Sequence, residues 1–383
     1  MNRKGRRFSM ANRHVTMGNH TVAKAALIAG CDFFGGYPIT PSSEIAQYMS
    51  GQMPLMGRAF IQMEDEISSL GSCIGAALTG RKAMTATSGP GYSLMMEHLG
   101  MAAIAEVPLV IVNVMRGGPS TGLPTKPGQA DMMQAKWGSH GDYPSIALYP
   151  AMPQQIVDET IRAFHLSQKY LTPVTLLLDE TIAKAHEDVE LPDPDSVKIF
   201  QEVNNAVTNL NMYDREMGER PPRIDFFKGY PVHVESLEHE QRGWPTNAVP
   251  VIDKMQNLRL QKILMHLDDI IKYETYQLDD AEIMIFSFGI SARASMEAVD
   301  NLRKEGIKVG LFQALTIWPF PEEALRGYFK KIKKVLTVEL NMGQMKYEIE
   351  RIATDDVLQK SMNKATGIPF KPAEVEKAVK EFV

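Results

Sequence analysis

Between residues 20 and 183, short apolar runs alternate with longer segments that are apolar along one side only. The longer segments carry apolar residues at helical spacing and predict helices at 20–31, 64–79, 91–105 and 153–170. The short runs predict strands at 32–36, 58–63, 82–87, 108–115 and 173–178. Because these strands are apolar throughout, the pattern predicts an α/β fold in which helices cover both faces of a parallel sheet.

The pattern changes after residue 183. Residues 184–280 are rich in Pro, Asn, Glu and Asp and keep no period, which predicts a long connection with local structure. A second α/β domain is expected over 281–383. Its strands are expected at 281–288, 308–315 and 334–340, and its helices at 291–305, 321–329 and 344–355. Residues 1–17 contain no acid and several Arg and Lys, which predicts a flexible basic tail and leaves 18–183 as the first domain.

Composition excludes several classes of protein. The 383 residues carry a net charge of −5, so the chain lacks the basic excess typical of a nucleic-acid-binding protein. No apolar run is long enough to cross a bilayer. The two cysteines form no disulfide framework, which favours a cytoplasmic location, and they cannot ligate an iron–sulfur cluster alone.

Two polar loops of the first domain follow predicted strands, at the edge where open α/β sheets bind ligands. In the loop 36–43, Thr40 is expected as the N-cap of a helix that has Pro41 in its first position. The loop 87–91 reads Thr-Ser-Gly-Pro-Gly, and its glycines permit a close approach of the backbone to a ligand. An ordinary helix cap and a tight turn are the structural alternatives for these loops.

A third loop, 116–127, follows the most apolar predicted strand and has little regular potential. Arg116 at its start has the geometry to hold a carboxylate in a bidentate fork. Lys126 is the other cation of the loop. The structural alternative is a surface arginine that pairs with a neighbouring acid. Long irregular loops at a sheet edge are more often functional than structural.

An acidic cluster opens the helix expected at 64–79. Glu64 and Asp65 are explained by the positive end of the helix dipole. Glu66 has a further feature, because small residues follow it along the helix and allow another element to approach closely. A carboxyl group beside such a contact is desolvated, which raises its pKa and lets it share a proton with a bound base.

The order of these motifs resembles the pyrimidine-binding domain of thiamine diphosphate enzymes, in which a glutamate lies nine residues before a small Gly-containing turn. Glu66 has that spacing to Gly75, whereas Glu64 does not. The segment Tyr-Pro-Ile-Thr-Pro-Ser at 37–42 resembles the signature of 2-oxoacid:ferredoxin oxidoreductases. The segment 116–126 resembles the alpha subunit of the 2-oxoglutarate branch of that family.

Two segments of the second half extend the resemblance. Leu237-Glu238-His239 is similar to a motif of the family's middle segment, although Glu235-Ser236 stands before it where the family often has Thr-Gly. Residues 315–321 and 339–344 are similar to the transketolase C-terminal-like domain. The resemblance therefore implies a pyrimidine-binding domain followed by a transketolase C-terminal-like domain.

The resemblance also implies a divided site. Family members bind the magnesium–diphosphate half of the cofactor with a Gly-Asp-Gly motif, and the nearest match here, Gly141-Asp142-Tyr143, lacks the second glycine. Thiamine diphosphate would thus be held by its pyrimidine half on this chain. A beta subunit would carry Mg²⁺ and a 4Fe–4S cluster, in an assembly of two alpha and two beta subunits.

The implied reaction is the reversible oxidative decarboxylation of 2-oxoglutarate with CoA, with electrons passing through the partner's cluster to ferredoxin and carbon dioxide fixed in the reverse direction. Glu66, Thr40 and Arg116 are the implied catalytic residues, and no metal ligand is expected on this chain. The cofactor would contact Glu66, Pro38, Ile39, Ser88, Gly89 and Pro90. The substrate would contact Thr40, Arg116, Ser120, Thr121 and Lys126.

Two alternative activities remain open. One is a branched-chain or other 2-oxoacid:ferredoxin oxidoreductase, which shares most of these loops. The other is a carboligase resembling acetolactate synthase, which the Thr-Ser-Gly-Pro-Gly segment at 87–91 suggests. Such carboligases carry the diphosphate motif on the same chain, which disfavours them here.

Overall fold

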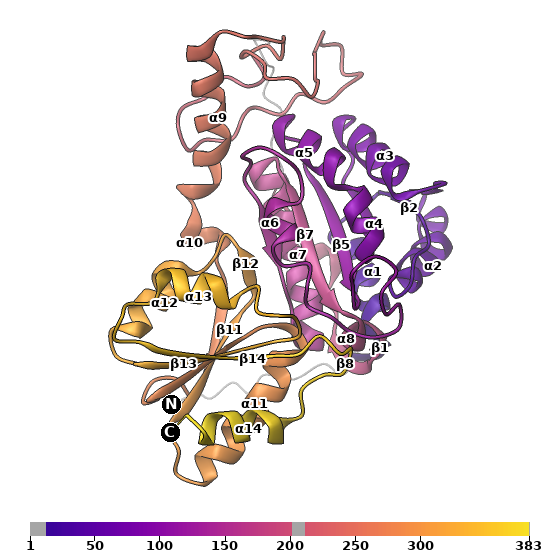
Figure 1. Cartoon of the computed structure of the whole chain (residues 1–383). Coiled ribbons are helices and arrows are strands. Elements are labelled where there is room, and N and C mark those ends of the chain that lie inside the picture. The colour runs from indigo at the N-terminus through magenta and orange to yellow at the C-terminus, as the bar shows by residue number, and fades with distance from the viewer. Residues whose placement is uncertain (1–12, 201–210, 383) are drawn as a thin grey trace, which may run out of the picture.

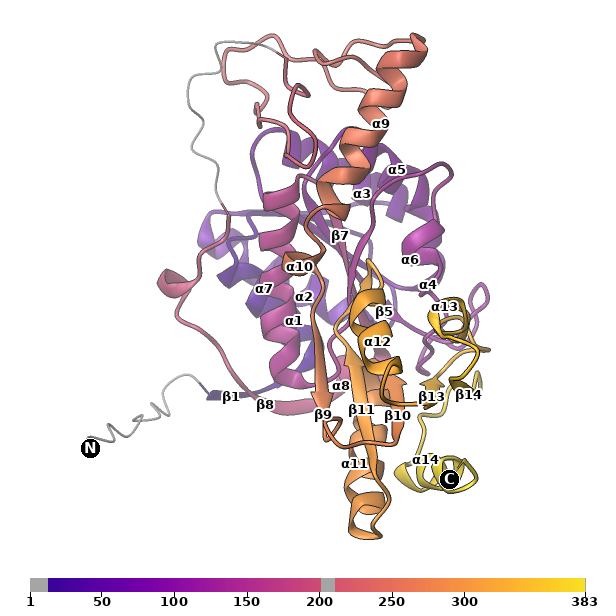
Figure 2. The ribbon, with the colours of Figure 1, turned by 90° about the vertical axis from the view of Figure 1, so that its left-hand side faces the viewer.

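The computed structural model describes residues 13–200 and 211–382. Two sheets organise these residues, and a helical arm projects beyond the first of them (Figure 1 and Figure 2). The strands are β1 (Arg13–Met17), β2 (Phe33–Gly36), β3 (Ala59–Gln62), β4 (Ala83–Thr87), β5 (Leu109–Met115), β6 (Ile146–Leu148), β7 (Pro173–Asp179), β8 (His186–Glu190), β9 (Tyr273–Tyr276), β10 (Ile283–Ser287), β11 (Val309–Ala314), β12 (Thr316–Trp318), β13 (Lys334–Glu339) and β14 (Leu358–Asn363). The helices are α1 (Gly18–Ile28), α2 (Ser43–Gln52), α3 (Glu66–Leu78), α4 (Gly89–Leu94), α5 (Met96–Ile104), α6 (Gln134–Trp137), α7 (Pro153–Tyr170), α8 (Glu180–Lys184), α9 (Val249–Leu264), α10 (Leu267–Ile270), α11 (Gly289–Lys304), α12 (Glu322–Phe329), α13 (Lys346–Ile352) and α14 (Pro372–Lys380), with short 3-10 turns at Pro54–Met56 and Pro194–Ser196.

The first sheet has the order β12-β6-β7-β5-β4-β2-β3, and all of its pairs are parallel except β12 with β6. Every residue of β5 and of β7 is buried, as their continuous apolar sequences predict. Apolar side chains of α1, α2 and α7 pack on one face of the sheet, and those of α3, α4 and α5 pack on the other. The predicted α/β fold with helices on both faces is confirmed.

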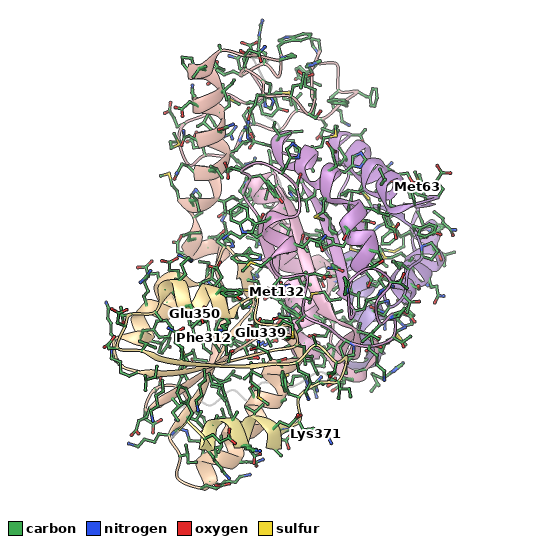
Figure 3. The ribbon with its side chains drawn as sticks, viewed as in Figure 1. Met63, Met132, Phe312, Glu339, Glu350 and Lys371 are labelled. Carbon is green, nitrogen blue, oxygen red and sulfur yellow. The ribbon has the colours of Figure 1, made fainter. Side chains whose placement is uncertain are left out.

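The second sheet has the order β14-β13-β10-β11-β9, in which only β9 is antiparallel to its neighbour. Helices α11 and α14 cover one face, and α12 and α13 cover the other. Two features join the sheets. The first is β12, which comes from the second half of the chain but pairs with β6 in the first sheet. In addition, Met132 of the first half belongs to the same apolar core as Phe312 of β11, at the junction seen in Figure 3. We keep the division at residues 183 and 281 as a proposal, with this strand exchange across it.

The basic tail expected over 1–17 is wrong for its last five residues. They form β1, which pairs with β8 in antiparallel register from Arg13 opposite Glu190 to Met17 opposite His186. The paired residues are far apart in the sequence, as Met17 opposite His186 shows, so no local pattern predicts the pairing. Residues 1–12 lie outside the described part of the chain.

The connection expected over 184–280 contains β8, the 16-residue α9, α10, β9 and a 3-10 turn, none of which we predicted individually. Helix α9 buries two cations, Arg259 and Lys262, along with its apolar residues, so its pattern lacks a clear apolar stripe. Lys262 Nζ lies 2.6 Å and Arg215 Nη2 2.8 Å from carboxylate oxygens of the buried Glu106. These ion pairs fasten the projecting arm to the end of α5.

Candidate active site

Three loops meet at the carboxyl edge of the first sheet, after β2, β4 and β5. Arg116 Nη1, beyond the end of β5, donates a hydrogen bond to the carbonyl oxygen of Thr40 at 2.6 Å. The Arg116 side chain also lies 3.5 Å from the point where a Cβ on Gly89 would stand. The fold thus brings together residues that are separated by more than 70 positions in the sequence.

Glu66 enters the same space from the first turn of α3. Asp65 is the N-cap of this helix, and its Oδ1 accepts the backbone N–H of Ser68 at 2.7 Å, so the helix starts two residues later than predicted. The cap turns Glu66 inward, where it is 5% exposed, while Glu64 stays exposed to solvent. Burial raises the pKa of the Glu66 carboxyl, Asp65 acts in the same direction, and Arg116 acts against them.

Gly91 leaves room for the Glu66 carboxylate. A Cβ at Gly91 would stand 2.4 Å from Glu66 Oε1 and 2.3 Å from Thr87 Oγ1, which no real side chain permits. The second glycine of the Thr-Ser-Gly-Pro-Gly segment therefore serves the close approach of α3 and α4. The helix predicted at 91–105 begins earlier, at Gly89, and is interrupted at Met95.

Several buried polar atoms at this edge lack a hydrogen-bond partner among the described residues. They are Thr87 Oγ1, Ser88 Oγ and Arg116 Nε. Buried hydroxyl and guanidinium groups are costly to leave unpaired, so such a cluster indicates a site for a polar ligand. A flat heterocycle with ring nitrogens and an amino group, such as the pyrimidine of thiamine diphosphate, offers complementary donors and acceptors for these groups and for the Glu66 carboxyl.

The electrostatic environment of Arg116 includes an acid that sequence reasoning missed. Burial lowers the pKa of Arg116, while Asp131 and Glu66 stabilise its charge. Asp131 accepts a hydrogen bond from Asn113 Nδ2 at 2.9 Å, and burial raises the pKa of its carboxyl. Asn113 is the one polar residue in the apolar run 108–115, and this exception to the pattern was the available signal for a polar site there.

The remaining predicted site residues lie farther out. Pro38 and Thr40 are exposed, Ile39 is half-buried, and Ser120, Thr121 and Lys126 are exposed on the loop after β5. The Lys126 side chain packs against Gly367 of the second half, and its charge acts on Glu180. In contrast, Ser88, Gly89 and Pro90 form the start of α4 beside Arg116.

The expectation that Thr40 caps a helix with Pro41 in its first position is wrong. Helix α2 begins at Ser43, and its N-cap is Ser42. A turn precedes the helix, because both the N–H and the Oγ of Ser42 donate to the carbonyl oxygen of Ile39 at 2.9 Å. This turn leaves the Thr40 carbonyl free to accept from Arg116.

No three acidic, His or Cys side chains of the described residues lie close enough to hold a metal ion. Within the same residues, no helix is both long enough and apolar enough to traverse a bilayer.

Comparison with known families identifies the protein family of this chain. Residues 24–257 match the thiamine diphosphate-binding domain of pyruvate flavodoxin/ferredoxin oxidoreductases, and residues 281–375 match core domain II of pyruvate:ferredoxin oxidoreductase. The chain belongs to the 2-oxoacid:ferredoxin oxidoreductases and corresponds to their alpha subunits.

Individual relatives refine this assignment. The 2-oxoglutarate synthase subunit KorA of Methanothermobacter marburgensis is 42% identical over 96% of this chain and 98% of its own length. The ketoisovalerate oxidoreductase subunit VorB of the same organism is 37% identical over 87% of this chain and 88% of its own length.

The solved structure of 2-oxoglutarate:ferredoxin oxidoreductase from Magnetococcus marinus, with 2-oxoglutarate, coenzyme A and succinyl-CoA bound, is also similar. It matches with a TM-score of 0.91 and 32% identity over 97% of this chain. This chain spans 65% of that longer polypeptide. A split-gene transketolase, 12% identical with a TM-score of 0.55, shares the fold.

Proposed function

We propose that the chain is the alpha subunit of a 2-oxoglutarate:ferredoxin oxidoreductase that converts 2-oxoglutarate and CoA to succinyl-CoA and carbon dioxide, reversibly, with ferredoxin as electron acceptor. The observation that carries the proposal is the buried Glu66 carboxyl facing Gly91, beside Arg116 and the Thr87 and Ser88 hydroxyls, which have no hydrogen-bond partner among the described residues. The relatives named 2-oxoglutarate synthase subunits support the choice of substrate.

Each residue of this edge has a task that its surroundings support. Glu66, whose pKa burial raises, would share a proton with the pyrimidine ring of the cofactor. Ser88, Gly89 and Pro90, together with Pro38 and Ile39, would hold that ring. When bound, thiamine diphosphate supplies the nucleophile and the electron sink for the decarboxylation.

Arg116 binds the carboxylate next to the reacting carbonyl in this proposal. One of its N–H groups is committed to the Thr40 carbonyl, which fixes the guanidinium plane. Its Nε–H is buried and unpaired among the described residues, so a donor remains for the substrate. Ser120, Thr121 and Lys126 are the groups of this chain that we assign to the distal carboxylate.

The other half of the site belongs, in this proposal, to a beta subunit that holds Mg²⁺, the diphosphate and a 4Fe–4S cluster, in a cytoplasmic assembly of two alpha and two beta subunits. Both cysteines of this chain, Cys31 and Cys73, are buried, and burial raises the pKa of both thiols. The chain purified alone is therefore expected to be colourless, inactive and free of iron. Iron and sulfide analysis checks this, and stoichiometric iron in the isolated chain would contradict it.

Substrate preference is tested on the enzyme assembled with its proposed beta subunit. The kcat/KM for viologen reduction is measured with 2-oxoglutarate, 2-oxoisovalerate and pyruvate. We expect 2-oxoglutarate to be preferred by roughly tenfold or more, since a site built for a second carboxylate loses its partner with the other acids. A preference for 2-oxoisovalerate would instead support the branched-chain alternative, which the VorB relatives keep as the second candidate. Membership of the ferredoxin oxidoreductase family leaves the carboligase alternative without support.

A further inference from the structure

The loop that carries Arg116 returns to its starting point, which gives it a narrow neck. Gly117 N donates to the carbonyl oxygen of Lys126 at 2.9 Å, and Leu123 N donates to the carbonyl oxygen of Gly117 at 2.7 Å. A Cβ on Gly128 would stand 2.9 Å from the Arg116 carbonyl oxygen. Whatever holds residue 128 and the residues after it therefore also holds the backbone of Arg116.

The second half of the chain forms hydrogen bonds with the segment just beyond this neck, residues 129–132. Gln129 N donates to the Leu340 carbonyl at 2.9 Å, and Asn341 Nδ2 donates to the Gln129 carbonyl at 2.6 Å. Gln344 Nε2 donates to the Ala130 carbonyl at 2.5 Å, and Trp318 Nε1 donates to that of Met132 at 2.7 Å. Met132, labelled in Figure 3, therefore lies in the core that the two halves of the chain share.

The side chain of Gln129 lies at the centre of these hydrogen bonds. Its side chain is fully buried, and Oε1 accepts from Ser291 Oγ at 2.9 Å and from Leu340 N at 2.8 Å. Its Nε2 donates to Asp179 Oδ1 at 3.1 Å and to the Phe288 carbonyl at 3.2 Å. One amide thus joins the end of β7, the start of α11 and the end of β13, and all of its hydrogen-bonding capacity is used.

We propose that Gln129 is a positioning residue for the substrate, through which the second half of the chain fixes the loop that holds Arg116. The inference rests on the proposed role of Arg116 in binding a 2-oxo acid. Arg116 lies on one side of the neck and Gln129 on the other, with Gly128 in contact with the Arg116 backbone. Asp131, whose charge stabilises that of Arg116, lies two residues after Gln129 in the same hydrogen-bonded segment.

The test needs a variant that removes an equivalent buried amide elsewhere. Gln155 is such a residue, since it too is a buried glutamine that bonds across the junction: Gln313 Nε2 of β11 donates to its Oε1 at 2.9 Å. Gln155 also bonds Glu274 of β9 at 2.9 Å, but it lies on α7, outside the loop of Arg116. Q129A and Q155A therefore have comparable structural costs and differ in what they hold.

The first measurement is steady-state kinetics of the assembled enzyme with the 2-oxo acid that the wild type prefers. We expect Q129A to raise the KM for the 2-oxo acid by roughly tenfold, because small displacements of a clamp group are costly, and to leave the KM for CoA unchanged. Q155A is expected to leave both KM values near those of the wild type. Equal KM values in Q129A and Q155A would overturn the proposal.

The second measurement, hydrogen exchange followed by mass spectrometry, needs no activity. In Q129A the amides of 117–128 should exchange at least about tenfold faster than in the wild type, whereas Q155A should leave them unchanged. If Q129A does not fold, S291A removes one of the same hydrogen bonds, and a smaller shift in the same segment is expected. Unchanged exchange at 117–128 in the variant that folds would overturn the proposal, whichever 2-oxo acid the enzyme uses.

Discussion

The carboxyl edges of the two sheets have the same architecture but differ in how completely their polar groups are paired. At the first edge, Thr87, Ser88 and Arg116 keep buried atoms without a partner among the described residues. At the second edge, Ser287 Oγ donates to the Val338 carbonyl at 2.9 Å, and Glu339 accepts the N–H of Met345 at 2.9 Å. Beyond residue 281, the one buried side-chain polar atom without a partner among the described residues is Gln313 Oε1, near the end of β11. The unpaired groups therefore cluster at the first edge, which supports the proposed ligand site, whereas the polar groups of the second edge are otherwise paired within the chain.

Removing the acid of the first edge should have the largest effect. Glu66→Ala is expected to lower kcat by about 10²–10⁴-fold, since it removes a proton-transfer group, while thermal stability is nearly unchanged. Glu64→Ala is the matched control, because Glu64 is exposed two residues away. Viologen reduction by both variants, assembled with the beta subunit, measures the effect. Equal losses in the two would mean that burial at this edge has no bearing on catalysis.

Asp179, at the junction between the edges, should make stability depend on pH. Burial raises its pKa to about 7 although Ile290 N–H, Tyr149 O–H and Gln129 N–H all donate to it. A raised carboxyl pKa means that stability is lost as pH rises from about 4 to about 7, by roughly 4 kcal/mol in total. Asp179→Asn cannot ionise, so its melting temperature should fall less than that of the wild type between pH 5 and 8. Parallel curves for the two proteins would contradict this.

At Glu339, whose hydrogen bonds go to Met345, Lys346 and Lys364 and not to residues 129–132, the second edge should respond through stability alone. Glu339 accepts the N–H of Met345 and of Lys346 with its two oxygens and so caps α13. In Glu339→Gln one of these donors faces an amide NH₂, which should cost about 1–3 kcal/mol of unfolding free energy. The kcat/KM for the 2-oxo acid should stay close to the wild-type value. Denaturant unfolding and kinetics of the same preparation check both statements.

The smallest expected effect concerns the tip of the loop after β5. Lys126→Met should lower kcat/KM for 2-oxoglutarate by several-fold relative to 2-oxobutyrate if the ammonium assists the distal carboxylate, since exposed ion pairs are weak. Lys126→Arg serves as the control, because it keeps both the positive charge and a long side chain beside Gly367. An unchanged ratio for the two acids in Lys126→Met would assign the distal carboxylate to another group.

The sequence patterns predict the first sheet well because its strands are buried on both faces and therefore apolar throughout, as in β5 and β7. The family resemblance selects Glu66 over Glu64 by its nine-residue spacing to Gly75, and the structure buries Glu66 and leaves Glu64 exposed. The space beside Gly75 is open, however, and the close approach to Glu66 comes from Gly91 of another helix, which the spacing does not predict. The sequence patterns miss Gln129 and Asp131, because the importance of these residues arises from partners that the tertiary fold brings to them from remote segments. Pairings such as β1 with β8 are beyond local patterns for the same reason.

The pairing of β12 with β6 limits where the polypeptide can be divided. A polypeptide that stopped before residue 281 would leave β6 as an uncovered edge strand, although all three of its residues are buried in the intact chain. Uncovered apolar edges pair readily with other molecules, so such a fragment should aggregate. Trp318, which closes over Met132 in the intact chain, would be lost with it. A single cut that keeps residues 316–318 with the first unit would also remove β10 and β11 from the second sheet, so the two units are not expected to tolerate separation at any one point.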